Sequence, residues 1–153
     1  MSTTDRIEKQ IWLKAPRTRV WQALSSAEEF GNWFGVALQG KSFTLGGHTS
    51  GNFTICGHED AVFDVTVVKM EPHQRMSLRW HPYAVDPARD YSGEPTTLIE
   101  FTLSDVEGGT LLKVVESGFD GIPAGRRLEA LRNNTQGWEG QLANIKRHLD
   151  AQA

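Results

Sequence analysis

Reactive side chains lie closest together in the sequence at Cys56-Gly57-His58-Glu59. A thiol, an imidazole and a carboxylate this near to one another could form a nucleophile pair or half of a metal site. No third group is placed to orient the imidazole, and the spacing is not that of metal ligands. We interpret the segment as the end of a strand followed by a polar turn. We predict neither a metal site nor a cofactor, since the other histidines are dispersed: His48, His73, His81 and His148.

The glycine-rich segment 46–51, with the sequence GGHTSG, superficially resembles a phosphate-binding loop. It lacks the Gly-Lys-Ser/Thr ending of such loops. It also lies between two predicted strands, whereas a phosphate loop opens a helix whose N-terminus holds the anion. We therefore interpret it as a connection between strands.

Glu116 is the most interesting candidate for ligand-binding or acid–base chemistry. Thr110, Leu112 and Val114 alternate along a predicted strand, and the same parity would turn Glu116 toward the inner side of the sheet. An unpaired carboxylate there would be costly, so Glu116 needs a partner or water. It could accept a hydrogen bond from a ligand or act as a general acid or base. The alternative is a structural glutamate that reaches solvent or pairs with an arginine.

A long C-terminal helix is the element that must position these groups, and we predict it over residues 126–149. Between its apolar positions lie charged residues, Arg126 among them, which form a predicted solvated face. The apolar stripe recurs at spacings of three and four: Leu128, Leu131, Thr135, Trp138, Leu142, Ile145 and Leu149. Only this side of the helix needs a cover, and the rest of the chain must supply it.

Alternating apolar residues predict that the cover is an antiparallel sheet. The expected strands are 6–14, 41–45, 51–56, 61–70, 76–80, 97–103 and 110–115. After the first strand we expect two short helices, one opened by Pro16 and one capped by Ser25 or Ser26. An unusually long loop follows at 81–95 and holds Tyr83 and Tyr91. This order predicts an α+β fold, with a curved antiparallel sheet of about six or seven strands wrapped around the terminal helix.

The overall composition excludes several classes of function. The 153 residues suit one domain, 1–153, and carry a net charge of −3 from 16 basic and 19 acidic residues. The basic residues are scattered, so we expect no nucleic-acid partner. Neither a signal peptide nor a membrane-spanning segment is evident, and the single cysteine, Cys56, cannot form an internal disulfide. We therefore expect a cytoplasmic protein without membrane insertion.

Several segments, in this order, resemble one family. They are IWLKAPRTRVWQAL, NWFG, VVKMEPHQRMSLRW, the pair TLIEFTL and GTLLKVVESGF, and GWEGQLANIKRHL. The set is similar to the Hsp90-ATPase-activator-homologue (AHSA1-like) family of the START-like/SRPBCC helix-grip superfamily. The resemblance covers nearly the whole chain. It implies a sheet wrapped around the C-terminal helix, with a cavity between them that is reached near the long loop.

From these observations we expect non-catalytic binding of a hydrophobic or aromatic small molecule in this cavity. Aromatic walls with a few polar groups are typical of small-molecule sites. The expected walls are Phe30, Trp33, Phe53, Trp80, Phe101 and Trp138, and Glu116 is the expected orienting group.

The resemblance also implies two alternatives. One is a chaperone partner that stimulates an Hsp90-type ATPase, although the eukaryotic activators join this domain to a separate N-terminal one that we do not expect here. The other is a cyclase-like or hydrolase-like cavity enzyme that uses Glu116 to move protons.

Overall fold

The computed structural model describes residues 5–84, 86 and 88–152. Its strands and helices follow one another in the order expected for an α+β domain. They are β1 (Arg6–Leu13), α1 (Arg17–Ser25), α2 (Ala27–Phe34), β2 (His48–Asn52), β3 (Val62–Glu71), β4 (Arg75–Trp80), β5 (Thr97–Val106), β6 (Gly109–Ser117), the short 3-10 helix η1 (Phe119–Gly121) and α3 (Ala124–Ala151).

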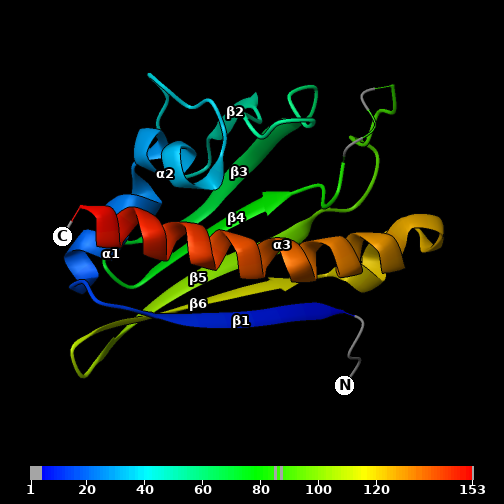
Figure 1. Ribbon diagram of the computed structural model, residues 1–153. Coiled ribbons are helices and arrows are strands. Elements are labelled where there is room, and N and C mark those ends of the chain that lie inside the picture. Colours follow the sequence, from blue (N-terminus) through cyan, green and yellow to red (C-terminus); the bar gives the residue numbers. More distant parts are fainter. Residues whose placement is uncertain (1–4, 85, 87, 153) are drawn as a thin grey trace.

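All six strands form one antiparallel sheet in the order β1-β6-β5-β4-β3-β2. Helix α3 lies over one face of this sheet, and α1 and α2 close the end at which α3 terminates (Figure 1). This is the helix-grip arrangement predicted from the sequence. The side chains between α3 and the sheet form a single apolar core.

The two short helices begin as their sequences predict. Pro16 directly precedes α1 and cannot disturb it, because the first N–H groups of a helix have no partner within the helix. Ser26 caps α2, since its hydroxyl accepts a hydrogen bond from the backbone N–H of Glu29 at 3.3 Å. Gly35 ends α2 in the left-handed conformation that favours glycine.

The predicted stripe on α3 is correct from Trp138 onward and wrong before it. Leu128 is 58% exposed, and Leu131 and Thr135 are only half-buried. The buried residues instead recur every four positions from a residue that we expected on the solvated face: Arg126, Ala130, Asn134 and Trp138. The prediction fails because Arg126 and Asn134 are polar but have buried polar partners, which a hydrophobicity pattern does not detect.

Two predicted strands also differ in the structure. Residues 41–45 form no strand, and the strand expected at 51–56 is β2, which begins earlier at His48 and ends at Asn52. Beyond it, Phe53 makes only an isolated bridge to Val36. A Cβ at Gly51 would lie 2.2 Å from the carbonyl oxygen of Ala37, so the chain after α2 packs directly on the backbone of β2. This close contact takes the place of the extra strand.

Candidate functional site

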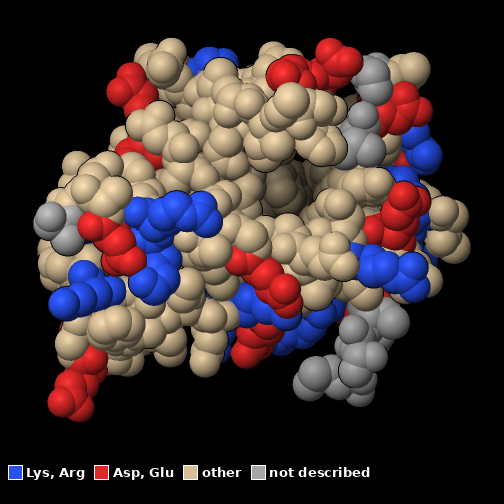
Figure 2. Space-filling model, viewed as in Figure 1, with Lys and Arg blue, Asp and Glu red and all other residues tan. Residues whose placement is uncertain are grey.

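A cavity of about 470 Å³ opens between α3, the end of β4 and two loops. Helix α3 contributes Asn133, Asn134, Gly137, Trp138 and Gln141 to its lining, and Phe34 and Phe53 contribute from the far side. The loop that follows β4 and the turn that precedes β3 form the mouth. Figure 2 shows the hollow in the tan part of the surface, with acidic side chains above and to the right of it.

Aromatic rings form the inner surface of the cavity. Trp80 at the end of β4 lies 6.1 Å from Trp138 of α3, measured between ring centroids. Phe34 lies 6.3 Å from Trp80 and 6.0 Å from Trp138, so three elements bring three rings together. The faces of these rings are apolar and exclude water, whereas the two indole N–H groups need hydrogen-bond partners.

Glu116 lies behind these rings and is fully buried. Its Oε2 accepts hydrogen bonds from Nε1 of Trp80 at 2.7 Å and from Oγ1 of Thr97 at 2.5 Å. Its Oε1 accepts from Nε1 of Trp138 at 2.8 Å and from Nδ2 of Asn134 at 3.0 Å. A carboxylate has about four acceptor positions, so the protein itself supplies a donor for each of them.

The carboxylate of Glu116 therefore determines which groups of the two tryptophans are available to a ligand in the cavity. Because both indole N–H groups donate to Glu116, neither is an unsatisfied donor that faces the cavity. The strand register creates this arrangement: Thr97 pairs with Trp80 across β4 and β5, and Ile99 pairs with Glu116 across β5 and β6.

The seven predicted site residues fall into three groups. Phe53, Trp80 and Trp138 line the cavity. Phe30, Trp33 and Phe101 do not: they are at most 5% exposed and pack in the core, where Phe30 stacks on Phe34 at 4.8 Å. Glu116 points to the inner side of the sheet, as its parity predicts, but it lies behind the wall and is not among the lining side chains. Parity identifies inward-pointing side chains and cannot tell which of them face a space.

Sequence reasoning missed Phe34 and Asn134. Phe34 is not among the expected cavity walls, but it contacts the core on one side and lines the cavity on the other. Asn134 belongs neither to the predicted apolar stripe of α3 nor to the expected site residues. Its position four residues before Trp138 was the available signal, because residues at this spacing share one face of a helix.

An arginine fastens the loop that follows β4 to α3. Arg126 is 8% exposed, and its Nη1 donates to the carbonyl oxygens of Pro82 at 2.7 Å and Tyr83 at 3.3 Å. Its Nε donates to Oε1 of Glu94 at 2.8 Å, and its guanidinium lies 4.7 Å from the ring centroid of Tyr91. This buried cluster shapes one side of the cavity mouth.

Glu94 and Tyr83 also help to attach this loop to α3. Burial alone would raise the pKa of the Glu94 carboxyl, but the hydrogen bonds and charges of Arg126 and Arg89 outweigh it and hold the pKa below its ordinary value. Tyr83 donates its hydroxyl to Oε1 of Glu129 at 3.1 Å, and this bond raises the pKa of Tyr83. Tyr83 also has a positive φ of 53°, which is uncommon for a bulky residue.

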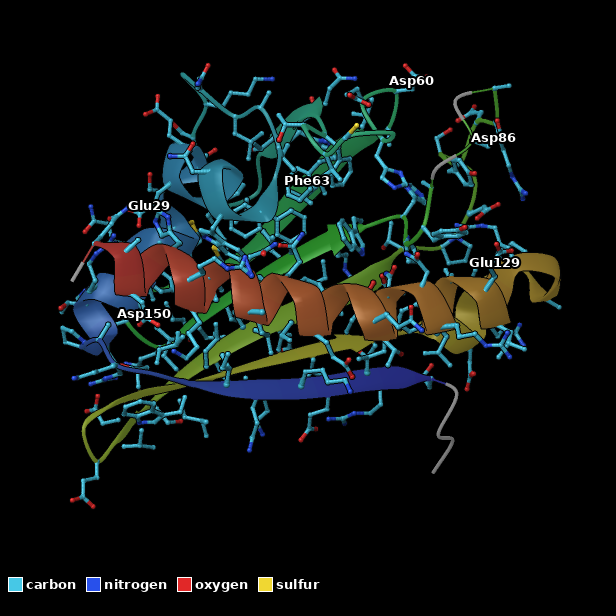
Figure 3. The ribbon with its side chains drawn as sticks, viewed as in Figure 1. Glu29, Asp60, Phe63, Asp86, Glu129 and Asp150 are labelled. Atoms are coloured by element: carbon cyan, nitrogen blue, oxygen red, sulfur yellow. The ribbon has the colours of Figure 1, made fainter. Side chains whose placement is uncertain are left out.

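Acidic side chains surround the mouth. Four aspartates are among the lining residues, against one arginine: Asp60, Asp64, Asp86 and Asp90, with Arg89. A hydrogen bond from the backbone N–H of Ser92 lowers the pKa of Asp90, so this carboxylate is ionised at neutral pH. Figure 3 shows Asp60 and Asp86 on neighbouring loops at the same end of the molecule.

The other motifs of interest lie elsewhere. Cys56 is exposed and precedes Gly57, which has the positive φ of a turn. Among the described residues, no three His, Cys, Asp or Glu side chains are grouped as metal ligands would be. In the same part of the chain, no helix is long and apolar enough to cross a membrane.

A family model matches residues 14–150 of this chain and is described as activator of Hsp90 ATPase homolog 1-like protein. A comparison with curated proteins gave no match.

Solved structures with the same fold include three that illustrate the range. The protein DynU16 of the dynemicin biosynthetic locus is 23% identical with a TM-score of 0.73, and the match covers 95% of this chain but 47% of that one. The protein MLL2253 from Mesorhizobium loti is 21% identical with a TM-score of 0.72, over 97% of this chain and 98% of that one. The Aha1 dimer from Colwellia psychrerythraea is 20% identical with a TM-score of 0.67, over 94% and 95%.

Proposed function

The chain belongs to the family of activator of Hsp90 ATPase homolog 1-like proteins, and we propose that it binds a hydrophobic or aromatic small molecule without transforming it. The cavity lined by Trp80, Trp138, Phe34 and Phe53 is the site. The observation that carries the proposal is the carboxylate of Glu116, which takes up the polar groups of both indoles and leaves an apolar wall.

The size of the cavity supports this proposal. Small-molecule sites commonly enclose about 300–1,000 Å³, and this one has about 470 Å³. A ligand that buries roughly 200 Å² of apolar surface gains about 5 kcal/mol, from which the cost of association is subtracted. Simple aromatic probes are therefore expected to bind weakly, with dissociation constants of roughly millimolar or higher, and a larger apolar probe should bind more tightly.

The surroundings of Glu116 argue against the enzyme alternative. A general acid or base must come within hydrogen-bonding reach of the proton that it moves. Glu116 is fully buried, and four protein groups already donate to its two oxygens. Its geometry suits a positioning group that holds the wall, and we assign it that role.

Two glycines of α3 provide a matched test. Gly137 lines the cavity, whereas Gly140 lies on the same helix outside it, and a Cβ at either position would meet nothing within 4 Å. We expect Gly137→Phe to fill the cavity and Gly140→Phe to leave it open. Both substitutions change helix propensity equally, so any difference between the variants reports the cavity.

The measurement uses N-phenyl-1-naphthylamine, a neutral dye that becomes fluorescent in apolar surroundings. We expect wild type and Gly140→Phe to bind the dye with similar affinity and to gain thermal stability from it. Gly137→Phe should lose at least tenfold in affinity while keeping a folded circular dichroism spectrum. Equal affinity in all three proteins would place the dye elsewhere and overturn the proposal, as would no binding to wild type.

The family description favours one alternative, stimulation of an Hsp90-type ATPase. A pull-down and an ATPase assay with the chaperone from the same source test it directly. Because the dye occupies the cavity and a chaperone would need an outer surface, Gly137→Phe should leave such stimulation unchanged. Stimulation that is lost in Gly137→Phe would instead connect the cavity with the chaperone.

A further inference from the structure

We propose that the molecule bound in the cavity is an organic cation, with an apolar or aromatic body and an ammonium group held at the mouth. This inference rests on the proposed binding function and adds the chemical class of the ligand. Three observations carry it: the aromatic wall, the acidic mouth, and the way in which the nearby arginines are occupied.

The acidity of the mouth is local to the cavity. The whole chain has 19 acidic and 16 basic residues, which is close to balance. Among the residues that line the cavity, however, four aspartates stand against one arginine. These aspartates come from separate segments, since Asp60 lies just before β3 and Asp64 lies within it, whereas Asp86 and Asp90 lie in the loop after β4. Two segments therefore bring carboxylates to one opening (Figure 3).

The positive groups near the mouth are engaged within the protein. Arg89 donates to Oε2 of Glu94 at 2.6 Å and lies 5.2 Å from the ring centroid of Tyr91. Arg126 donates to the other oxygen of Glu94 at 2.8 Å and to the carbonyl oxygen of Pro82 at 2.7 Å. With one glutamate between two arginines, the cluster adds a single positive charge, which does not balance Asp60, Asp86 and Asp90. The fourth aspartate, Asp64, is engaged by a histidine. His48 contacts Asp64 at 2.9 Å and is 69% exposed in its side chain.

The aromatic wall suits a cation as well as an apolar body. The faces of tryptophan, tyrosine and phenylalanine rings carry negative electrostatic potential and attract ammonium groups. A ligand can therefore place its body against Trp80 and Trp138 and its ammonium group among the aspartates. A carboxylate ligand of the same shape would meet repulsion at the mouth, because no uncommitted arginine or lysine is among the lining residues that the structure describes.

Three probes of one shape test this inference: 2-naphthylmethylamine, 2-naphthalenemethanol and 2-naphthoate. We expect calorimetric affinities in the order ammonium, alcohol, carboxylate, with a roughly five- to tenfold gap at each step at low ionic strength. The gaps should shrink in 0.5 M salt, since screening weakens interactions at exposed charges. The signals of the Trp80 and Trp138 indole N–H groups in ¹H–¹⁵N spectra report whether each probe enters the cavity.

A triple variant, Asp60→Asn, Asp86→Asn and Asp90→Asn, tests the source of the preference. The asparagine oxygen can still accept the turn hydrogen bonds of Ala88 and Ser92. We expect the ammonium probe to lose about tenfold, the carboxylate probe to gain, and the alcohol to stay within twofold. The control variant, Glu71→Gln, Glu107→Gln and Asp150→Asn, makes the same change of net charge outside the cavity, and Asp150 lies at the opposite end of α3 (Figure 3).

The outcomes separate the two proposals. Alcohol binding with no preference for the ammonium probe, or a preference for the carboxylate, overturns the cationic class and leaves cavity binding intact. If the control variant abolishes the preference to the same extent as the triple variant, the cationic class is overturned as well, because the effect would then come from net charge. No binding of any probe to the wild-type protein overturns both proposals.

Discussion

Glu116 is unusual because it is fully buried and all of its hydrogen-bond partners are uncharged. It accepts hydrogen bonds from Trp80, Thr97, Asn134 and Trp138, and no arginine or lysine is among these partners. The sequence predicts the inward direction of this glutamate from strand parity. It does not predict the partners, because Thr97, Trp80 and Asn134 come from three different elements and only the folded structure brings them together.

Replacement of Glu116 by glutamine should be strongly destabilising. The glutamine NH₂ group would face N–H or O–H groups that now donate to the carboxylate, so some buried donors would lose their acceptor. We expect the free energy of unfolding to fall by about 3 kcal/mol, measured by urea denaturation. Affinity for N-phenyl-1-naphthylamine should fall in the same variant, since the indole that faces the new NH₂ group loses its acceptor.

Glu100 provides the control for this prediction. It lies in β5, next to the residue that pairs with Glu116, but on the opposite face of the sheet. Glu100→Gln should change the free energy of unfolding by less than about 0.5 kcal/mol. A similar small change in Glu116→Gln would show that the buried network contributes little to stability.

Among the elements, α3 shows most clearly what a periodic pattern can and cannot reveal. Its second half follows the predicted stripe because Trp138, Leu142, Ile145 and Leu149 pack on apolar side chains. Its first half departs from the stripe because Asn134 donates a hydrogen bond to Glu116 and Arg126 donates one to the loop after β4. Strands β3 to β6 are predicted well, since most of the residues on one face of each strand are apolar. Polar residues on a buried face are thus where the sequence pattern is least informative.

The attachment of the loop to α3 predicts a dependence of stability on pH. The depressed pKa of Glu94 means that the ionised carboxylate stabilises the folded state. This contribution is fully present above the pKa of the unfolded state, near 4.5, and it is lost as the pH falls through the lower pKa of the folded state. We expect Glu94→Gln to cost about 1 kcal/mol at pH 7 and progressively less below pH 4.5.

Urea denaturation of wild type and Glu94→Gln between pH 7 and pH 3 measures this difference. Glu139→Gln is a suitable control, because Glu139 also forms an ion pair, with Lys9, but is 60% exposed in its side chain. Hydrogen exchange should show faster opening of the loop after β4 in Glu94→Gln and unchanged exchange in β6. A difference between wild type and Glu94→Gln that does not vary with pH would contradict the assignment.

At the scale of the whole molecule, the space between sheet and helix has a filled part and a hollow part. Phe30 contacts the rings of Phe43, Phe63 and Phe101 at 5.3 to 6.4 Å, and these four side chains are buried. Beyond Phe34 the rings of Trp80 and Trp138 face the cavity instead. The sequence predicts both sets of rings as inward-pointing, and only packing in three dimensions separates them.

This division predicts opposite effects for two equivalent substitutions. Phe30→Leu removes ring contacts from the filled part, so it should lower the free energy of unfolding by about 1–2 kcal/mol. Its affinity for N-phenyl-1-naphthylamine should stay within twofold of wild type, because Phe30 does not line the cavity. Phe53→Leu should do the reverse, with a small loss of stability and a loss of affinity of about threefold or more, since Phe53 is half-buried on the cavity wall. Parallel urea titrations and dye titrations of the two variants decide between this division and a single continuous core, in which both variants would lose stability and affinity together.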